Sequence, residues 1–356
     1  MAYLWALIVR NPIGFCRFLY AFGTHVILLS LRQALLPGWP AYQSFRTQLQ
    51  RAYWASSLLV FPELIRGPPV TDLDCPPARA RRVGVDWTGY VIPGSRDLKY
   101  KQPNNGLQCV VLFAHGGGYA RGEARMYLDY MKRWIEGALE EGLNLTFLSV
   151  EYPLSDEAPC PAQQEAFLKA YKYVLDEGVA PKDIIFMGDS AGGGLCVLSL
   201  LEAKNRGLPQ PAGGVLLSPW MDVSLRSFQG GNALVETDFL VNANEVVPMM
   251  ASAWLKGKPA TSPAVNPLFC TPVDFQGLCP LLIFVGGGEC MLQDSKDLAS
   301  LCRAGGVPHH LEVEWGQLHV YGLGHKWVSP AVRQKTDRMI YRWVKDCAAG
   351  RMCRDA

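Results

Sequence analysis

A serine between small residues stands where an apolar segment meets a helix-like one. Residues 188–192 read Gly-Asp-Ser-Ala-Gly, a G-x-S-x-G pattern directly after the apolar run 183–187. The segment 195–201 has leucine at every third position, a helical spacing. Strand, sharp turn and helix are the context of a nucleophile elbow, which lifts a serine Oγ out of a sheet toward a substrate. The sequence therefore predicts that Ser190 is a nucleophile.

A serine hydroxyl attacks poorly at neutral pH, so this chemistry also requires a base and donors for a developing oxyanion. The donors are indicated by His115-Gly-Gly-Gly118, which follows the apolar strand 110–114. Glycines let backbone N–H groups approach a negative oxygen without a Cβ in the way. An ordinary glycine-rich turn is the alternative interpretation, but the position of this run upstream of the serine favours an oxyanion loop.

An acid and a histidine are expected after the serine, in that order. Glu289 follows the apolar strand 281–285 through three glycines, and His319 follows the alternating strand 310–315. Both lie beyond the carboxyl ends of strands, where open parallel sheets place their sites. Of the six histidines, His319 is therefore the best-placed base, whereas His115 suits a hydrogen-bonding scaffold.

On these motifs the chain resembles the hormone-sensitive lipase family of α/β-hydrolases, which includes bacterial esterases and arylacetamide deacetylase. The resemblance spans roughly residues 85–345 and is carried by HGGG at 115–118, EYPL at 151–154, GDSAGG at 188–193, SPWMD at 218–222, GGGE at 286–289 and His319. It implies a catalytic set of Ser190, His319 and Glu289, with oxyanion N–H groups from Gly117, Gly118 and Ala191. It implies no cofactor and no metal.

The acid position departs from the family, which usually has aspartate where this chain has Glu289. A glutamate can orient an imidazole as well, because only a carboxylate at Nδ1 is required. Its extra methylene needs a backbone set slightly farther back. Asp294 is a second candidate for the same role, although a helix N-cap or loop carboxylate is the preferred interpretation of that residue.

Strand-like and helix-like segments alternate through most of the chain, which predicts an α/β class. With the resemblance, this implies an α/β-hydrolase fold: a mostly parallel central sheet flanked by helices, with a helical cap. The expected strands include 82–92, 109–114, 145–150 and 214–218, and the expected helices include 125–141, 162–175 and 331–344. We expect an N-terminal cap or lid over 1–80, core over 81–223 and 269–356, and a cap insertion over 224–268.

The first 80 residues allow two interpretations. The apolar run Phe18–Leu31 is short for a bilayer span of about 20 residues. Pro12 and Pro37 predict division into short helices. Helices of a lid over the site are favoured over helices on or in a membrane. The lid interpretation expects five side chains to be buried against residues 224–268: Trp5, Phe15, Phe18, Leu28 and Leu35.

Composition restricts the partners and the compartment. The chain is 49% apolar and 19% charged with a net charge of +2, which fits a packed core and argues against a nucleic-acid partner. Its eleven cysteines lack metal-ligand spacing or a disulfide framework, so a reducing interior, cytoplasmic or membrane-associated, is expected. The expected partner is a small apolar ester or natural product, with N-terminal contact to a membrane surface as a further expectation.

Three functions are compatible with these motifs. The first is a serine esterase or deacetylase acting on an apolar, small to medium carboxylic ester. The second is a non-hydrolytic condensation, dehydration or acyl transfer in secondary metabolism, because residues 36–40 and 61–64 are similar to segments of fungal tailoring hydrolases. The third is a ligand-binding module such as the plant gibberellin receptors, which lack the catalytic histidine. The presence of His319 favours an enzyme.

Overall fold

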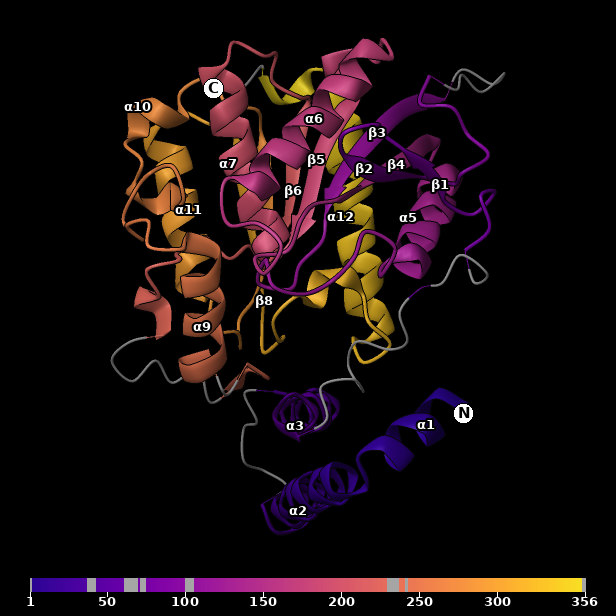
Figure 1. Ribbon diagram of the computed structural model, residues 1–356, viewed down its shortest axis with the longest axis vertical. Helices are drawn as coiled ribbons and strands as arrows, with labels where there is room; N and C mark the ends of the chain where they lie inside the picture. The colour runs from indigo at the N-terminus through magenta and orange to yellow at the C-terminus, as the bar shows by residue number, and fades with distance from the viewer. Residues whose placement is uncertain are drawn as a thin grey trace.

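An eight-stranded sheet forms the centre of the described part of the molecule (Figure 1). The computed structural model describes residues 2–36, 43–60, 70, 75–99, 106–228, 237–240 and 243–353. The strand order is β1-β2-β4-β3-β5-β6-β7-β8. Strand β2 runs antiparallel to its neighbours β1 and β4, and the six strands from β3 to β8 are mutually parallel. The strands are β1 (Arg81–Val83), β2 (Thr88–Ile92), β3 (Leu107–Ala114), β4 (Leu143–Glu151), β5 (Ile184–Asp189), β6 (Gly213–Leu217), β7 (Leu281–Gly286) and β8 (His309–Glu314).

Helices cover both faces of this sheet, which is why the central strands are apolar without alternation. The helices are α1 (Ala2–Arg10), α2 (Pro12–Leu35), α3 (Phe45–Val60), α5 (Leu128–Glu140), α6 (Ala162–Asp176), α7 (Ala191–Asn205), α9 (Ala243–Leu255), α10 (Pro272–Phe275), α11 (Leu292–Ala304) and α12 (Pro330–Ala348). Along β3, Val110 and Leu112 belong to the core cluster formed with α6 and α7, whereas Val111 and Phe113 belong to the one formed with α5 and α12. The predicted α/β-hydrolase fold is thereby confirmed.

The predicted single strand over 82–92 was wrong in one respect. It is a hairpin of β1 and β2, whose register pairs Arg81 with Val91. Gly84 takes a positive φ of 99° at the turn, and a Cβ there would lie 2.3 Å from the carbonyl oxygen of Trp87. The turn therefore requires glycine, and the chain reverses inside what reads as one extended segment.

The N-terminal helices lie outside the core, with α3 between α2 and the rest of the molecule (Figure 1). The predicted division into short helices was wrong for α2, because Pro12 occupies its first turn and so begins the helix. The predicted burial against residues 224–268 was also wrong: Trp5, Leu28 and Leu35 are 67%, 60% and 74% exposed. Phe18 is buried, but against Tyr53 of α3.

The α3 helix contacts two segments that lie near the end of the sheet. The indole of Trp54 packs edge-on against Phe239 at 4.5 Å and against His325 at 4.8 Å between ring centroids. The side-chain amide of Gln43, just before α3, donates to the carbonyl of Thr237 at 2.9 Å. Within the described part of the N-terminal region, α3 and Gln43 just before it therefore contact residues 224–268.

Candidate active site

Ser190 occupies a sharp turn between β5 and α7. Its φ of +51° and ψ of −122° lie outside the regions that L-residues ordinarily adopt, so the surrounding structure must hold it there. A Cβ on Gly192 would lie 2.1 Å from the carbonyl oxygen of Ala114, and one on Gly188 would lie 2.5 Å from the oxygen of Gly192. Gly192 is thus required by the close approach of β3 to the turn, and Gly188 by the tightness of the turn itself.

Ser190, His319 and Glu289 form one hydrogen-bonded series. The Ser190 Oγ lies 3.0 Å from Nε2 of His319, and Nδ1 of His319 lies 3.2 Å from Oε1 of Glu289. The serine is 9% exposed and the histidine 4%, so the series is nearly enclosed. The structure thus brings together the three residues that the sequence predicts as the catalytic set. Ser190 and His319 are 129 positions apart in the chain.

Electrostatics favour a proton on the imidazole of His319. Burial acts to lower the pKa of His319, but the hydrogen bond and charge of Glu289 outweigh it, with further contributions from Asp238 and Asp189. The pKa of His319 is consequently raised above its ordinary value. A nearby carboxylate stabilises an imidazolium in this way whenever the pair is shielded from water.

Two donors hold the carboxylate of Glu289. Its Oε2 accepts a hydrogen bond from the hydroxyl of Ser218 at 2.6 Å and from the backbone N–H of Gly286 at 2.7 Å. The same Ser218 hydroxyl accepts the N–H of Val320 at 2.9 Å, so it connects the acid to the residue after the histidine. These contacts leave Oε1 directed at the imidazole.

The glycine-rich loop after β3 presents backbone donors beside Ser190. Gly117 and Gly118 have φ of +118° and +63°, a conformation that glycine tolerates. Among the described residues, the N–H groups of Gly117, Gly118 and Ala191 have no hydrogen-bond acceptor. The N–H of Gly116, by contrast, donates to Asp189 at 2.8 Å. The three unpaired N–H groups are the ones that the resemblance assigned to an oxyanion hole.

Asp189 connects this loop to the elbow. Besides Gly116, it accepts the hydroxyl of Tyr127 at 2.9 Å. Burial raises the pKa of Asp189 to about 7, while its two donors act to lower it. The carboxylate therefore orders the loop from within the protein, one residue before the serine.

His115 is buried beneath the loop and stacks on Tyr152 at 4.2 Å between ring centroids. Burial lowers its pKa to about 4, so the ring is neutral at physiological pH. The Nδ1 atom lies 2.8 Å from the carbonyl oxygen of Gly116. Its place and its contacts are those of a scaffold for the oxyanion loop.

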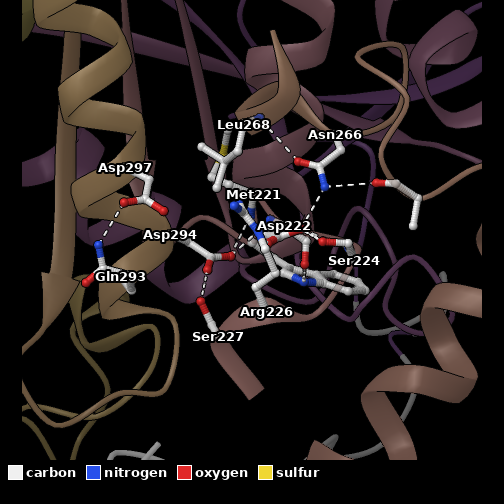
Figure 2. Close-up of polar contacts among 12 residues, drawn as sticks. Met221, Asp222, Ser224, Arg226, Ser227, Asn266, Leu268, Gln293, Asp294 and Asp297 are labelled. Atoms are coloured by element: carbon white, nitrogen blue, oxygen red, sulfur yellow. Dashed lines mark hydrogen bonds and ion pairs between the residues drawn. The ribbon is translucent and has the colours of Figure 1, made fainter. Parts of the chain in front are cut away.

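Asp294 lies in a different cluster, shown in Figure 2. Its Oδ2 accepts the backbone N–H groups of Met221 and Asp222 at 3.3 and 3.0 Å, and its Oδ1 accepts the hydroxyl of Ser227. Asp222 in turn accepts the amide of Asn266 at 2.7 Å. Asp294, in the first turn of α11, thus holds the start of the 224–268 insertion, and Asp222 joins that start to Asn266 near the other end.

Sequence reasoning missed the partners that hold these residues in place. Ser218 and Asp189 are inside the motifs that carry the family resemblance, but their roles depend on contacts across the sheet. Asp238 had no signal at all, because it is one acidic residue in an insertion without a recognisable motif. It accepts the backbone N–H of His319 at 3.2 Å.

Known proteins with similar sequences and structures are ester hydrolases. A family model described as alpha/beta hydrolase fold matches residues 111–323. An acetyl-hydrolase of Streptomyces hygroscopicus is 30% identical over 255 residues, covering 71% of this chain and 78% of that protein. The crystal structure of EstE5 soaked in ethyl alcohol has a TM-score of 0.65 and 30% identity, covering 76% of this chain and 85% of its own. The hormone-sensitive lipase homologue EstE7 from a metagenome library has a TM-score of 0.64 and 27% identity, covering 92% and 98%.

Proposed function

Because the chain belongs to the hormone-sensitive lipase-like α/β-hydrolases and is a serine carboxylic-ester hydrolase, we propose that Ser190, His319 and Glu289 carry its reaction. The observation that carries this proposal is the series of contacts from Ser190 Oγ through the imidazole to Glu289. The unpaired N–H groups of Gly117, Gly118 and Ala191 support the same assignment.

In the proposed reaction, Nε2 of His319 accepts the hydroxyl proton as Ser190 Oγ attacks the ester carbonyl. The carbonyl oxygen becomes negative and accepts the oxyanion N–H groups. Collapse of this intermediate breaks the C–O bond, and the imidazolium returns its proton to the leaving alcohol. Water then attacks the acyl-serine with His319 again as base, which releases the carboxylic acid and restores the serine. Glu289 stabilises the imidazolium during both steps.

We propose that the acyl group is small to medium and apolar. The sulfur of Met250, on α9, lies against the oxyanion loop, because a Cβ on Gly118 would approach it to 2.4 Å. Beyond it, the rings of Tyr119 and Trp254 stack at 4.3 Å. These side chains limit the space beside the ester carbonyl. The name of the similar acetyl-hydrolase likewise refers to a small acyl group, acetyl.

The test is hydrolysis of p-nitrophenyl esters of increasing acyl length, with Ser190→Ala as the control. We expect turnover that declines for long chains and is abolished in the variant. A fluorophosphonate probe should label Ser190 in the wild-type protein, with the adduct located by peptide mass spectrometry. Undiminished hydrolysis by Ser190→Ala, or an adduct on another residue, contradicts the assignment.

We further propose that α3 and the 224–268 insertion form the cap of the site. The ring contact between Trp54 and Phe239 supports it, and so does the position of Phe239, 6.0 Å from the ring of His319. The alternative of non-hydrolytic tailoring chemistry gains no support from the described residues. The similarity on which it depended is in residues 36–40 and 61–64, and all of these except Leu36 lie outside the described residues.

Helix α2 is long and apolar enough to cross a membrane, and we propose that it attaches the enzyme to one. Its 24 residues span about 36 Å at about 1.5 Å per residue. In the most apolar 18-residue stretch of this helix, only 11% of the residues are buried by the described part of the protein. Large apolar side chains such as Ile27 and Leu31 face outward. A lipid phase would cover this surface, whereas water would not.

A further inference from the structure

A second buried carboxylate, Asp238, supports the backbone of the catalytic loops. Its Oδ1 accepts the N–H of His319 at 3.2 Å and that of Phe239 at 2.8 Å. Its Oδ2 accepts from the N–H of Cys290 at 3.2 Å and lies 3.3 Å from the Cys290 thiol. Asp238 therefore contacts both the histidine and the residue that directly follows Glu289.

The groups that contact Asp238 are all hydrogen-bond donors. Each of these contacts comes from an N–H or S–H donor, and an ionised carboxylate accepts such bonds at both oxygens. Burial raises the pKa of the Asp238 carboxyl above its ordinary value and the charge of Glu289 adds to this rise, while His319 and the N–H groups of Phe239 and His319 offset it only in part. In its ionised form, Asp238 places a negative charge near the imidazole of His319, which becomes positive during the reaction.

The segment that carries Asp238 is held from the side of α3. The Nε of Arg51 donates to the carbonyl oxygen of Asp238 at 3.1 Å. On the other side, the hydroxyl of Thr237 donates to the carbonyl of Gly288 at 2.8 Å, one residue before Glu289. Asp238 is therefore the point at which the proposed cap reaches the loops after β7 and β8.

We propose that Asp238 is a positioning residue for ester hydrolysis, a role that rests on His319 being the general base. It holds the backbone of His319 and Cys290 in register and adds a second negative charge beside the imidazolium. The backbone of His319 is therefore fully supported only when the cap segment 237–240 packs against it. The activity of the triad then depends on the cap as well as on the core.

The charged and titratable groups that face His319 come from separate elements. Glu289 faces it from the loop after β7, Asp189 from the end of β5 and Asp238 from the insertion. His325 also lies nearby, but burial lowers its pKa to about 3, so it is neutral. Asp238→Asn therefore removes a charge near His319, and its amide nitrogen also removes an acceptor from the N–H groups at one end of the carboxylate, so the substitution tests both parts of the proposed role.

The test is Asp238→Asn in the full chain, with kcat and KM measured across pH and normalised to sites titrated with a fluorophosphonate. We expect the acid limb of kcat/KM to move to lower pH by on the order of one unit, as for loss of a nearby opposite charge. We expect kcat to fall on the order of tenfold, since small displacements of a catalytic group are costly, with KM nearly unchanged. Asp294→Asn is the matched control, because that buried carboxylate faces the 221–227 loop and should leave the acid limb in place.

An unmoved acid limb together with wild-type kcat per titrated site overturns the proposal. If Asp238→Asn yields no folded protein, Arg51→Ala decides, because Arg51 contacts the segment through the Asp238 carbonyl and leaves the carboxylate intact. We then expect a severalfold lower kcat with an unmoved acid limb, and wild-type kcat overturns the proposal. Ester hydrolysis that survives Ser190→Ala would instead refute the triad, which separates the two failures.

Discussion

The catalytic end of the sheet and helix α2 use apolar residues in opposite ways. The strands that lead to Ser190 and Glu289, β5 and β7, are buried along their whole length, and the polar side chains of the site pair with one another. Helix α2 buries little and presents large apolar side chains outward. The comparison teaches that the catalytic end is packed by protein, whereas α2 has an apolar surface that the described residues leave largely uncovered.

Helix α3 lies between these two regions, because it packs against α2 on one side and against Phe239 near the catalytic site on the other. Its Tyr53 meets the rings of Phe18 and Phe22 edge-on, at 5.7 and 5.6 Å between centroids. Its Trp54 meets Phe239 near the catalytic histidine. An expected boundary between attachment and catalysis therefore falls between α2 and α3, inside the predicted 1–80 region.

The largest effect is expected within the catalytic end, at Glu289. Glu289→Gln replaces the carboxylate with a neutral amide that no longer stabilises the imidazolium. We expect kcat/KM to fall by about 10³–10⁴-fold with the fold retained, as in a comparable serine protease substitution. Asp294→Asn is the control, and we expect it to reduce stability more than kcat. An inactive Asp294→Asn beside a nearly normal Glu289→Gln would reverse the two assignments.

The pH profile of the same reaction should reflect the raised pKa of His319. The imidazole must be neutral to act as a base, and a raised pKa keeps it protonated up to a higher pH. We therefore expect kcat/KM to decline as pH falls through a midpoint above about 6.5, the ordinary histidine value. An acid limb centred below that value would show that burial outweighs the surrounding carboxylates.

A smaller effect is expected where the cap meets the oxyanion loop. Met250→Ala removes the side chain beside Gly118 and should favour longer acyl groups, by on the order of tenfold in the ratio of kcat/KM for octanoate over acetate. Met249→Ala is the matched control, because Met249 is 61% exposed on the same helix. An unchanged chain-length preference in Met250→Ala would remove Met250 from the acyl site.

The smallest effect on catalysis is expected from deleting residues 1–36. Without α1 and α2 the enzyme should no longer float with phospholipid vesicles, and kcat/KM for soluble esters should stay within about twofold, since α3 remains on the core. Deletion of residues 1–60 is the comparison, because it also removes Trp54 and Arg51 from the cap. Equal activity and chain-length preference in both truncated proteins would show that α3 has no part in the cap.

Much of the fold and of the candidate site was readable from sequence because the evidence was local. The glycines beside Ser190 are demanded by a turn only a few residues long, and the apolar runs 110–114, 183–187 and 281–285 mark buried strands by themselves. Their order along the chain then placed an acid and a histidine after the serine. Each of these inferences depends on neighbours in sequence or on a recurring motif.

Tertiary structure alone decided which distant groups meet. Glu289 rather than Asp294 faces the imidazole because Ser218 and Gly286 donate hydrogen bonds to Glu289. The carboxylate of Asp294 instead accepts hydrogen bonds from the loop after β6. Asp238 reaches His319 from an insertion whose sequence carries no motif. The exposure of α2 likewise depends on what packs beside it, not on its own composition. Contacts between residues far apart in the chain leave no local pattern, so the sequence determined the catalytic elements and the folded chain determined their supports.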